Sequence, residues 1–215
     1  NVASSGASVE SDRVDPHFSP TPQFWITNSD IPASGRREWS LAFRDIARAT
    51  DARTCIASII PSTAAGNTLP LIVPDPDAAR DYAKFAPLLL ANLNSMAFDY
   101  VVRQKAQSTH LNWYILEQLP VVRADAFDQT IGDVRISDFV RSEVLILTYT
   151  AHDLAPFGRD LGHGGPPFVW NEDDRRDRIA RLDALFFHLY RIGKDDADYI
   201  LGTFPIVREQ DEAAF

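Results

Sequence analysis

The chain of 215 residues is 45% hydrophobic and 24% charged, ordinary proportions for a folded protein of one large domain or two small ones. A single cysteine, Cys55, excludes an internal disulfide framework and a cysteine metal cluster, and no apolar run approaches the roughly 20 residues of a membrane span. The net charge of −9 argues at first sight against nucleic acid, but residues 33–123 hold 10 Lys/Arg and 8 Asp/Glu, whereas the remainder holds 11 and 22.

The first 34 residues show no regular periodicity, and we expect a flexible or strap-like lead-in that contains one strand-like run, Phe24–Ile26. The chain lacks an initiator methionine, so we expect a fragment of a longer protein or a processed chain. Because no secretory signal is visible, we expect a cytoplasmic protein with no membrane partner.

Three short strands are predicted next. Alternating apolar and small or polar residues over Trp39–Ile46 indicate a half-buried strand. The β-branched, apolar run Thr54–Ile60 indicates a more central strand that ends at Pro61, and it makes Cys55 a buried thiol. A third strand is expected at Leu71–Val73. Asp75 then caps a short helix that runs to about Phe85.

The stretch from Pro87 to Val122 changes character part-way along. Apolar residues at helical spacing predict one long helix with Pro87 in its first position. A polar, basic loop follows, and then a short helix that ends at Pro120. Amides, hydroxyls and basic groups on a rigid helix are typical of base and phosphate recognition, although a solvated connection between helices is the simpler alternative.

After Val122 the pattern is helical. Ser137 is expected to cap a helix that ends near Leu154, and a glycine- and proline-rich loop follows at Gly158–Pro167. Asn171 is expected to cap a strong amphipathic helix that ends at Gly193, with a further short helix from Asp195 to Gly202. The predicted fold class is therefore α+β: short strands plus a long helix, followed by an α-helical C-terminal region.

Catalytic and metal sites find no support in the residue spacing. The five histidines show no metal-type pairing, and the acidic residues at Glu172–Asp174 are first-turn helix charges. Asp81 and Lys84 have the wrong spacing for a nuclease carboxylate–lysine pair on a strand. We therefore expect no catalytic residue and no metal site.

Several segments together resemble the C-terminal target-recognition region of large N6-adenine DNA methyltransferases, the fused Type IIG restriction–modification enzymes and bacterial phage-defence methylases. The similarity covers roughly residues 35–205 in the right order, and the order of the segments carries more weight than any one of them. The segments that carry it are Trp39–Arg48, Thr50–Pro61, Leu93–Arg103, His110–Pro120, Arg175–Leu185, Phe187–Tyr190 and Tyr199–Pro205.

The resemblance implies DNA recognition by a mixed α/β globule over residues 35–123, followed by a helical region over 124–215. Arg44 and Arg103 have an equal alternative as structural arginines that pair with Asp45, Asp51 or Asp99. The basic and polar residues that the resemblance implies for DNA binding are Arg36, Arg37, Arg44, Arg48, Arg53, Arg103, Gln104, Lys105, Ser108, Thr109, His110 and Asn112.

Two motifs of the methyltransferase family are missing. Gly165-Pro166-Pro167-Phe168 has glycine where the family needs an Asn or Asp for the adenine amino group, and no glycine-rich cofactor loop precedes it. The resemblance therefore implies that S-adenosylmethionine binds an upstream methyltransferase domain of the same chain, and that this fragment is not an enzyme by itself. Its expected partners are double-stranded DNA and that upstream domain.

Two alternatives belong to other functional classes. The chain could be a protein-interaction module of a defence complex whose acidic helical surface docks a partner without contacting DNA. A stand-alone hydrolase has no positive support in the sequence.

Overall fold

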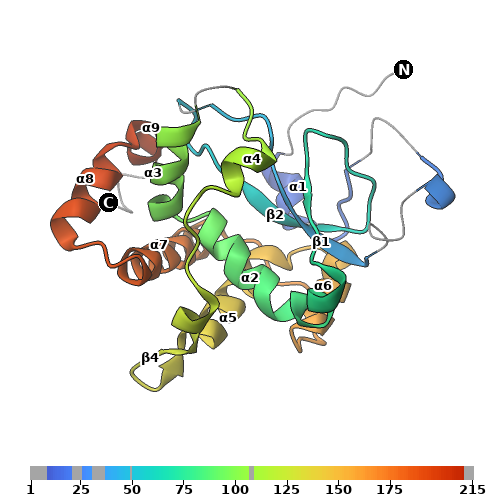
Figure 1. The fold of residues 1–215 in the computed structure, drawn as a ribbon. Coiled ribbons are helices and arrows are strands. Elements are labelled where there is room, and N and C mark those ends of the chain that lie inside the picture. The colour runs from blue at the N-terminus through green and yellow to red at the C-terminus, as the bar shows by residue number, and fades with distance from the viewer. Residues whose placement is uncertain (1–8, 21–25, 31–36, 49, 107–108, 211–215) are drawn as a thin grey trace.

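The computed structural model describes residues 9–20, 26–30, 37–48, 50–106 and 109–210. Within them, helices surround a small antiparallel sheet, and a two-stranded hairpin lies apart from it (Figure 1). The predicted α+β class is confirmed. Four residues named in the predictions from sequence lie outside the described residues: Phe24, Trp25, Arg36 and Ser108.

The main sheet has the strand order β2–β1–β3, and both pairings are antiparallel. Its strands are β1 (Trp39–Phe43), β2 (Ala57–Pro61) and β3 (Leu71–Ile72). The prediction that β1 is half-buried and that β2 is more central is wrong, because β1 is the central strand and all five of its residues are buried. Ser40 and Ala42 point to the face of the strand that was expected to be exposed. Their small side chains let other parts of the chain pack closely over that face, which the alternating pattern alone could not show.

The predicted long helix is two helices, α2 (Tyr82–Leu93) and α3 (Met96–Lys105), bent by 67° at the break between them. Ser95 caps α3 by accepting a bond from the Phe98 N–H group. Pro87 lies inside α2 because a 3₁₀ turn, η3 (Pro76–Asp81), leads directly into that helix. The predicted cap at Asp75 is confirmed, since its side chain accepts the N–H group of Asp77.

None of the described helices is by itself long and apolar enough to cross a membrane, and only this bent pair passes the test of length and composition when its two parts are joined.

The other elements are mostly short helices. Their bounds are α1 (Glu10–Val14), η1 (Asn28–Asp30), α4 (Trp113–Leu116), η4 (Ala124–Asp128), β4 (Thr130–Ile131), β5 (Val134–Arg135), α5 (Ile136–Thr148), η5 (His152–Leu154), α6 (Ala155–Asp160), α7 (Glu172–Leu189), α8 (Lys194–Gly202) and α9 (Pro205–Gln210).

Helix boundaries in the C-terminal region differ in part from the predicted ones. Ser137 lies inside α5 and is not its cap, and the β4–β5 hairpin was not predicted. The Asn171 cap of α7 is confirmed by a 2.9 Å bond from the Asp174 N–H group. That helix ends before Gly193, at a turn where Arg191 adopts the left-handed conformation, with φ 57°.

One hydrophobic cluster spans the chain from the sheet to α7. Its buried residues include Leu41 and Phe43 in β1, Leu93 in α2, Val140 in α5 and Phe186 in α7. A smaller cluster around Phe204 packs α8 and the start of α9 against α3. Residues on both sides of position 123 therefore share a core, and the predicted domain boundary there stays a prediction.

Candidate nucleic-acid interface

The segment that follows β1 pairs with the loop that precedes α4. The N–H group of Ala47 donates to the carbonyl of Thr109 at 3.0 Å, and the N–H group of Leu111 donates to the carbonyl of Asp45 at 2.7 Å. An antiparallel bridge between Ile46 and His110 lies between these two bonds. The pairing brings together two groups of predicted DNA-binding residues that are about 60 positions apart in the sequence.

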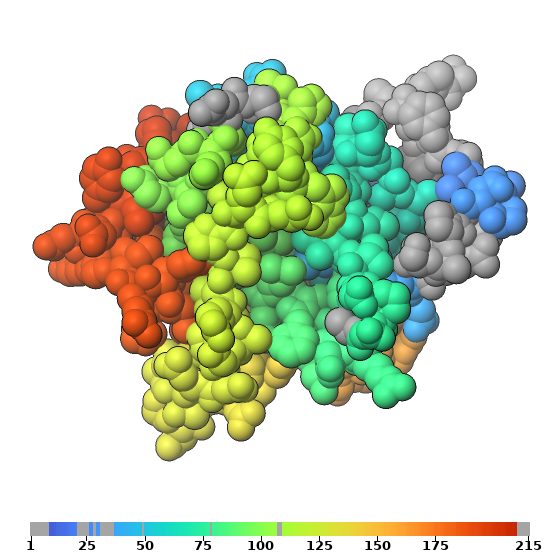
Figure 2. All heavy atoms as spheres, viewed as in Figure 1, coloured from blue at the N-terminus to red at the C-terminus, as the bar shows by residue number. Residues whose placement is uncertain are grey.

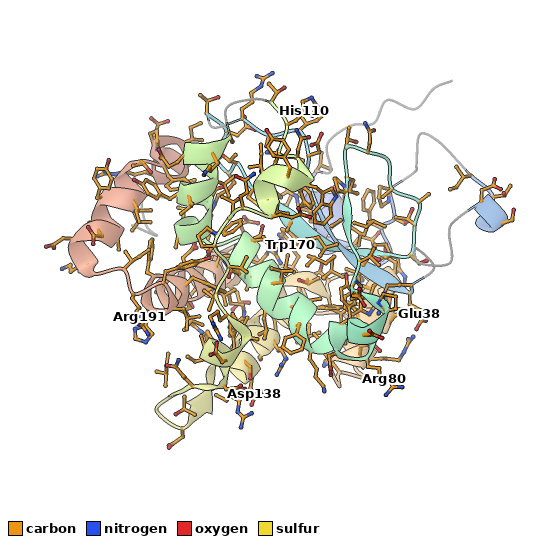
Figure 3. All side chains as sticks on the ribbon, viewed as in Figure 1. Glu38, Arg80, His110, Asp138, Trp170 and Arg191 are labelled. Atoms are coloured by element: carbon orange, nitrogen blue, oxygen red, sulfur yellow. The ribbon has the colours of Figure 1, made fainter. Side chains whose placement is uncertain are left out.

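Most of the predicted residues near this pairing are exposed. Gln104 and Lys105 occupy the last turn of α3, Arg48 ends the first paired segment, and the label of His110 marks the second in Figure 3. We call the following set the exposed rim: Arg48, Gln104, Lys105, Thr109, His110 and Asn112.

A hydrogen-bonded pair fixes His110 within the exposed rim. Its Nδ1 lies 2.6 Å from the Oδ2 atom of Asp45, and because the carboxylate accepts, the imidazole Nδ1–H donates. The His110 side chain is 52% exposed, whereas that of Asp45 is 11% exposed. The buried carboxylate of Asp45 therefore fixes the orientation of the imidazole, while the rest of the ring stays exposed to solvent.

Beside this pair lies a hollow of about 420 Å³, which we call the His110 hollow. Trp113 stands at its edge, 42% exposed, and makes a T-shaped contact with the buried Phe43 at 5.2 Å between ring centroids. Neither Trp113 nor Asn67 was predicted as a site residue, since both occur in ordinary helix and turn patterns. The lining residues are Asp45, Asn67, Pro70, His110, Asn112 and Trp113.

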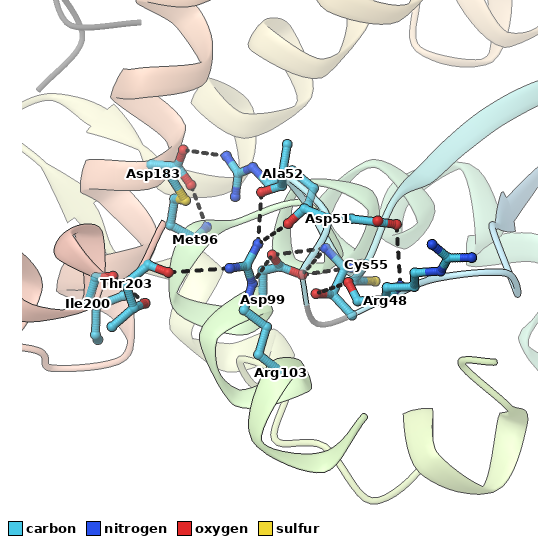
Figure 4. Close-up of polar contacts among 12 residues, drawn as sticks. Arg48, Asp51, Ala52, Cys55, Met96, Asp99, Arg103, Asp183, Ile200 and Thr203 are labelled. Carbon is cyan, nitrogen blue, oxygen red and sulfur yellow. Dashed lines mark hydrogen bonds and ion pairs between the residues drawn. The ribbon is translucent and has the colours of Figure 1, made fainter. Parts of the chain in front are cut away.

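Arg103, another predicted DNA-binding residue, is directed into the protein (Figure 4). Its guanidinium donates to the carbonyls of Asp51 at 2.6 Å and Ala52 at 2.9 Å, and more weakly to that of Thr203 at 3.3 Å. The side chain is 11% exposed and pairs with Asp99 at 3.4 Å. These contacts match the structural alternative that the sequence left open for Arg103.

Asp99 holds the chain just before β2. Its fully buried carboxylate accepts the N–H group of Thr54 at 3.0 Å and that of Cys55 at 2.6 Å. Burial, with Asp99 nearby, raises the pKa of the Cys55 thiol to about 12. The thiol is therefore protonated and enclosed, as predicted for a structural cysteine.

Two more predicted arginines also have internal partners. Arg53 pairs with Asp183 at 3.2 Å, and burial raises the pKa of that carboxyl group although Arg53 opposes the shift. Arg44 pairs with Asp51 at 3.2 Å and donates to the Arg53 carbonyl. To contact DNA, each of these guanidinium groups would have to break its bonds within the protein or bind a phosphate in addition to them.

Arg37 stands apart from the exposed rim. It precedes β1, whereas Arg48 follows it, and its guanidinium lies over the Tyr82 ring at 4.5 Å from the centroid. Of the predicted residues that the structure describes, those of the exposed rim lie in the paired segments or within a few residues of them, whereas four arginines lie outside the rim: Arg37, Arg44, Arg53 and Arg103.

A larger hollow, of about 540 Å³, opens between β2 and helices α2, α5 and α7. The Arg175 guanidinium in its wall stacks on Trp170 at 3.6 Å and donates to the carbonyl of Leu147 at 2.6 Å. Arg53, which also lines it, is held by Asp183. Both arginines of this hollow therefore already have partners within the protein, and the hollow contributes little to a DNA interface.

The described residues contain no group of three or more His, Cys, Asp or Glu side chains that could hold a metal ion. Comparisons with protein-family models, with curated proteins and with solved structures found no match to this chain.

Proposed function

We propose that this chain is the DNA target-recognition part of a site-specific adenine-N6 DNA methyltransferase or restriction–modification enzyme. It would position duplex DNA for an upstream domain of the same chain, which binds S-adenosylmethionine and methylates a flipped adenine. Such an enzyme would act in the bacterial cytoplasm. The ordered resemblance over residues 35–205 supports this proposal.

The observation that carries the proposal is the backbone pairing of residues 45–47 with 109–111. It places Arg48 next to the segment that carries His110 and Asn112, and Gln104 and Lys105 precede that segment in the last turn of α3. Arg48 and Lys105 are cations suited to phosphates, which fix the register of a protein on DNA. Gln104 and Asn112 offer amides that can bond base edges in the major groove.

Fluorescence anisotropy with a labelled mixed-sequence duplex tests the proposal. Binding should weaken steeply as salt rises, because each phosphate contact releases counterions. Arg48→Ala and Lys105→Ala should each reduce the slope of log affinity against log salt by about 1.

Arg80→Ala is the matched control. Arg80 is an exposed arginine of η3 that Figure 3 shows far from His110, so its removal changes the net charge equally without touching the exposed rim. Failure of the folded chain to bind duplex at low salt, or an equal effect of Arg80→Ala, would contradict the proposal.

A second candidate is a protein-interaction module of a defence complex. The β4–β5 hairpin favours it, since this hairpin projects from the body in Figure 1 and leaves Ile131 55% and Val134 53% exposed. Exposed β-branched residues on a projecting element are suited to contact with another chain. This candidate predicts association that Ile131→Ser with Val134→Ser abolishes, and no binding to DNA.

A further inference from the structure

The His110 hollow holds two rings that are fixed before any ligand arrives. Trp113 packs edge-to-face with Phe43, which is fully buried in β1, so the indole is supported from the core while 42% of its surface stays exposed. The Asp45 carboxylate holds His110 at 2.6 Å. Two pre-set rings lower the entropy cost of stacking a third ring beside them.

The polar groups of the His110 hollow complement a heterocycle with mixed donors and acceptors. Asn67 and Asn112 line it with exposed side chains, and each amide offers a carbonyl acceptor and an NH₂ donor. Pro70 adds an apolar wall. Aromatic faces beside amide groups form the combination that proteins use to stack unpaired bases and bond their edges.

The surroundings of the hollow connect it to the exposed rim. His110 and Asn112 belong to both, and Asn67 comes from the loop between β2 and β3. The chain near residues 110–120 and the chain near 60–75 lie side by side on the surface in Figure 2. Arg48 lies two residues beyond Ile46, the bridge partner of His110, so a nucleic acid whose backbone contacts Arg48 would place its bases within reach of the hollow.

We propose that the His110 hollow binds one unstacked nucleobase, with the base ring against Trp113 and its edge on the amides of Asn67 and Asn112. This inference rests on the proposed function, because the exposed rim brings the nucleic acid to the hollow. Its ligand is a base that has left the stack, either from a duplex or from a single strand. Enzymes that take a base out of a duplex need less energy at a mismatch, where pairing is already lost.

The experiment compares three labelled probes: a perfect duplex, the same duplex with one central mismatch, and the single strand alone. The wild-type chain should bind the mismatched duplex at least about fivefold more tightly than the perfect one. Trp113→Ala should weaken binding of the single strand roughly 5- to 150-fold, the range that loss of one base–aromatic stack produces.

Two further variants separate the hollow from general damage. Asn67→Ala changes an exposed loop residue and should remove the mismatch preference without loss of folding, checked by circular dichroism. Tyr114→Ala is the matched control, because Tyr114 is the next aromatic residue of α4, is 62% exposed and does not line the hollow. It should bind all three probes as the wild type does.

The outcomes distinguish this inference from the proposed function. Salt-sensitive duplex binding without a mismatch preference, and with no effect of Trp113→Ala or Asn67→Ala, would overturn the nucleobase site and leave the proposed function standing. Single-strand binding that depends on Trp113, without duplex binding, would overturn the proposed function but support the hollow. Absence of binding to all three probes would overturn both.

Discussion

The guanidinium carbon of Arg103 lies 3.9 Å from the centroid of the Phe204 ring. This contact joins α3 to the turn between α8 and α9, while the same guanidinium donates to the carbonyls of Asp51 and Ala52. Phe204 is 1% exposed, so the cation–π contact is formed away from water, where it is strongest. Arg103 therefore ties three separate parts of the chain together.

Replacement of Arg103 should weaken folding strongly. Arg103→Ala leaves Asp99 buried without its cationic partner, and we expect the free energy of unfolding to fall by about 3–5 kcal/mol. Arg103→Lys should recover little of this, because an ammonium group lacks the planar fork that reaches two carbonyls. Urea denaturation measures both values.

The control for this prediction is Arg48→Ala, which removes an exposed arginine and should change stability by no more than about 0.5 kcal/mol. If Arg103→Ala were as stable as Arg48→Ala but lost DNA binding, Arg103 would act in recognition and not in folding.

Stability should fall as the pH rises above about 9. Burial raises the pKa of Cys55 from 9.0 to about 12 and that of Tyr190 from 10.0 to about 12, and it also raises the pKa of Tyr82. At a pH between the unfolded-state and folded-state pKa values, the folded protein binds more protons than the unfolded chain. The stabilisation that these groups contribute is therefore fully present below pH 9 and is lost as the pH rises toward 12.

Urea midpoints measured from about pH 8 to about pH 11 test the alkaline effect. Cys55→Ala should give a shallower decline, since one of the shifted groups is gone. A flat profile in the wild type would contradict the assignment of these groups to a buried environment.

Cys55 should resist thiol reagents in the native protein. With a pKa of about 12, only about one thiol in ten thousand is ionised at pH 8, and the side chain is enclosed. Alkylation by iodoacetamide, followed by mass spectrometry across a urea series, should rise together with global unfolding. Rapid labelling without urea would show that the chain before β2 opens locally.

The helix caps offer a matched pair of substitutions. Asn171→Ala removes the side-chain bond to the Asp174 N–H group at the start of α7 and should cost about 1 kcal/mol. Ser137→Ala removes no capping bond, because Ser137 lies within α5, and should cost clearly less. Thermal unfolding of both variants decides the point, and equal losses would restore Ser137 as a cap.

Elements defined by local chemistry could be predicted from the sequence. The caps at Asp75 and Asn171 depend on bonds to residues two or three positions away, and both are confirmed. The break between α2 and α3 was missed although Ser95 caps α3 through a local bond to the Phe98 N–H group, and the Asn94 side chain beside it also bonds both backbone groups of Ala57, 37 positions away. The β4–β5 hairpin was not predicted, because its strand residues are all exposed and therefore show no alternation of apolar and polar residues.

In the candidate site, too, features set by residue type could be predicted from the sequence, whereas features set by long-range contacts could not. Residue type and the family resemblance pointed to Arg48, Lys105 and Asn112, all of which are exposed in the structure, but the sequence could not show which arginines face inward. Arg53 is held by Asp183, 130 positions away, and Arg103 by Thr203, 100 positions away. The His110–Asp45 pair spans 65 positions and depends likewise on tertiary structure.

The pairing of residues 45–47 with 109–111 is made by backbone groups. Arg48 and Asn112, which flank it, contribute no side chain to these bonds, so other residues can replace them while the ladder persists. Under the proposed function, the DNA sequence that the exposed rim reads could then change by the exchange of surface side chains one at a time. If the proposed function holds, such a scaffold would let binding specificity diverge at little risk to folding.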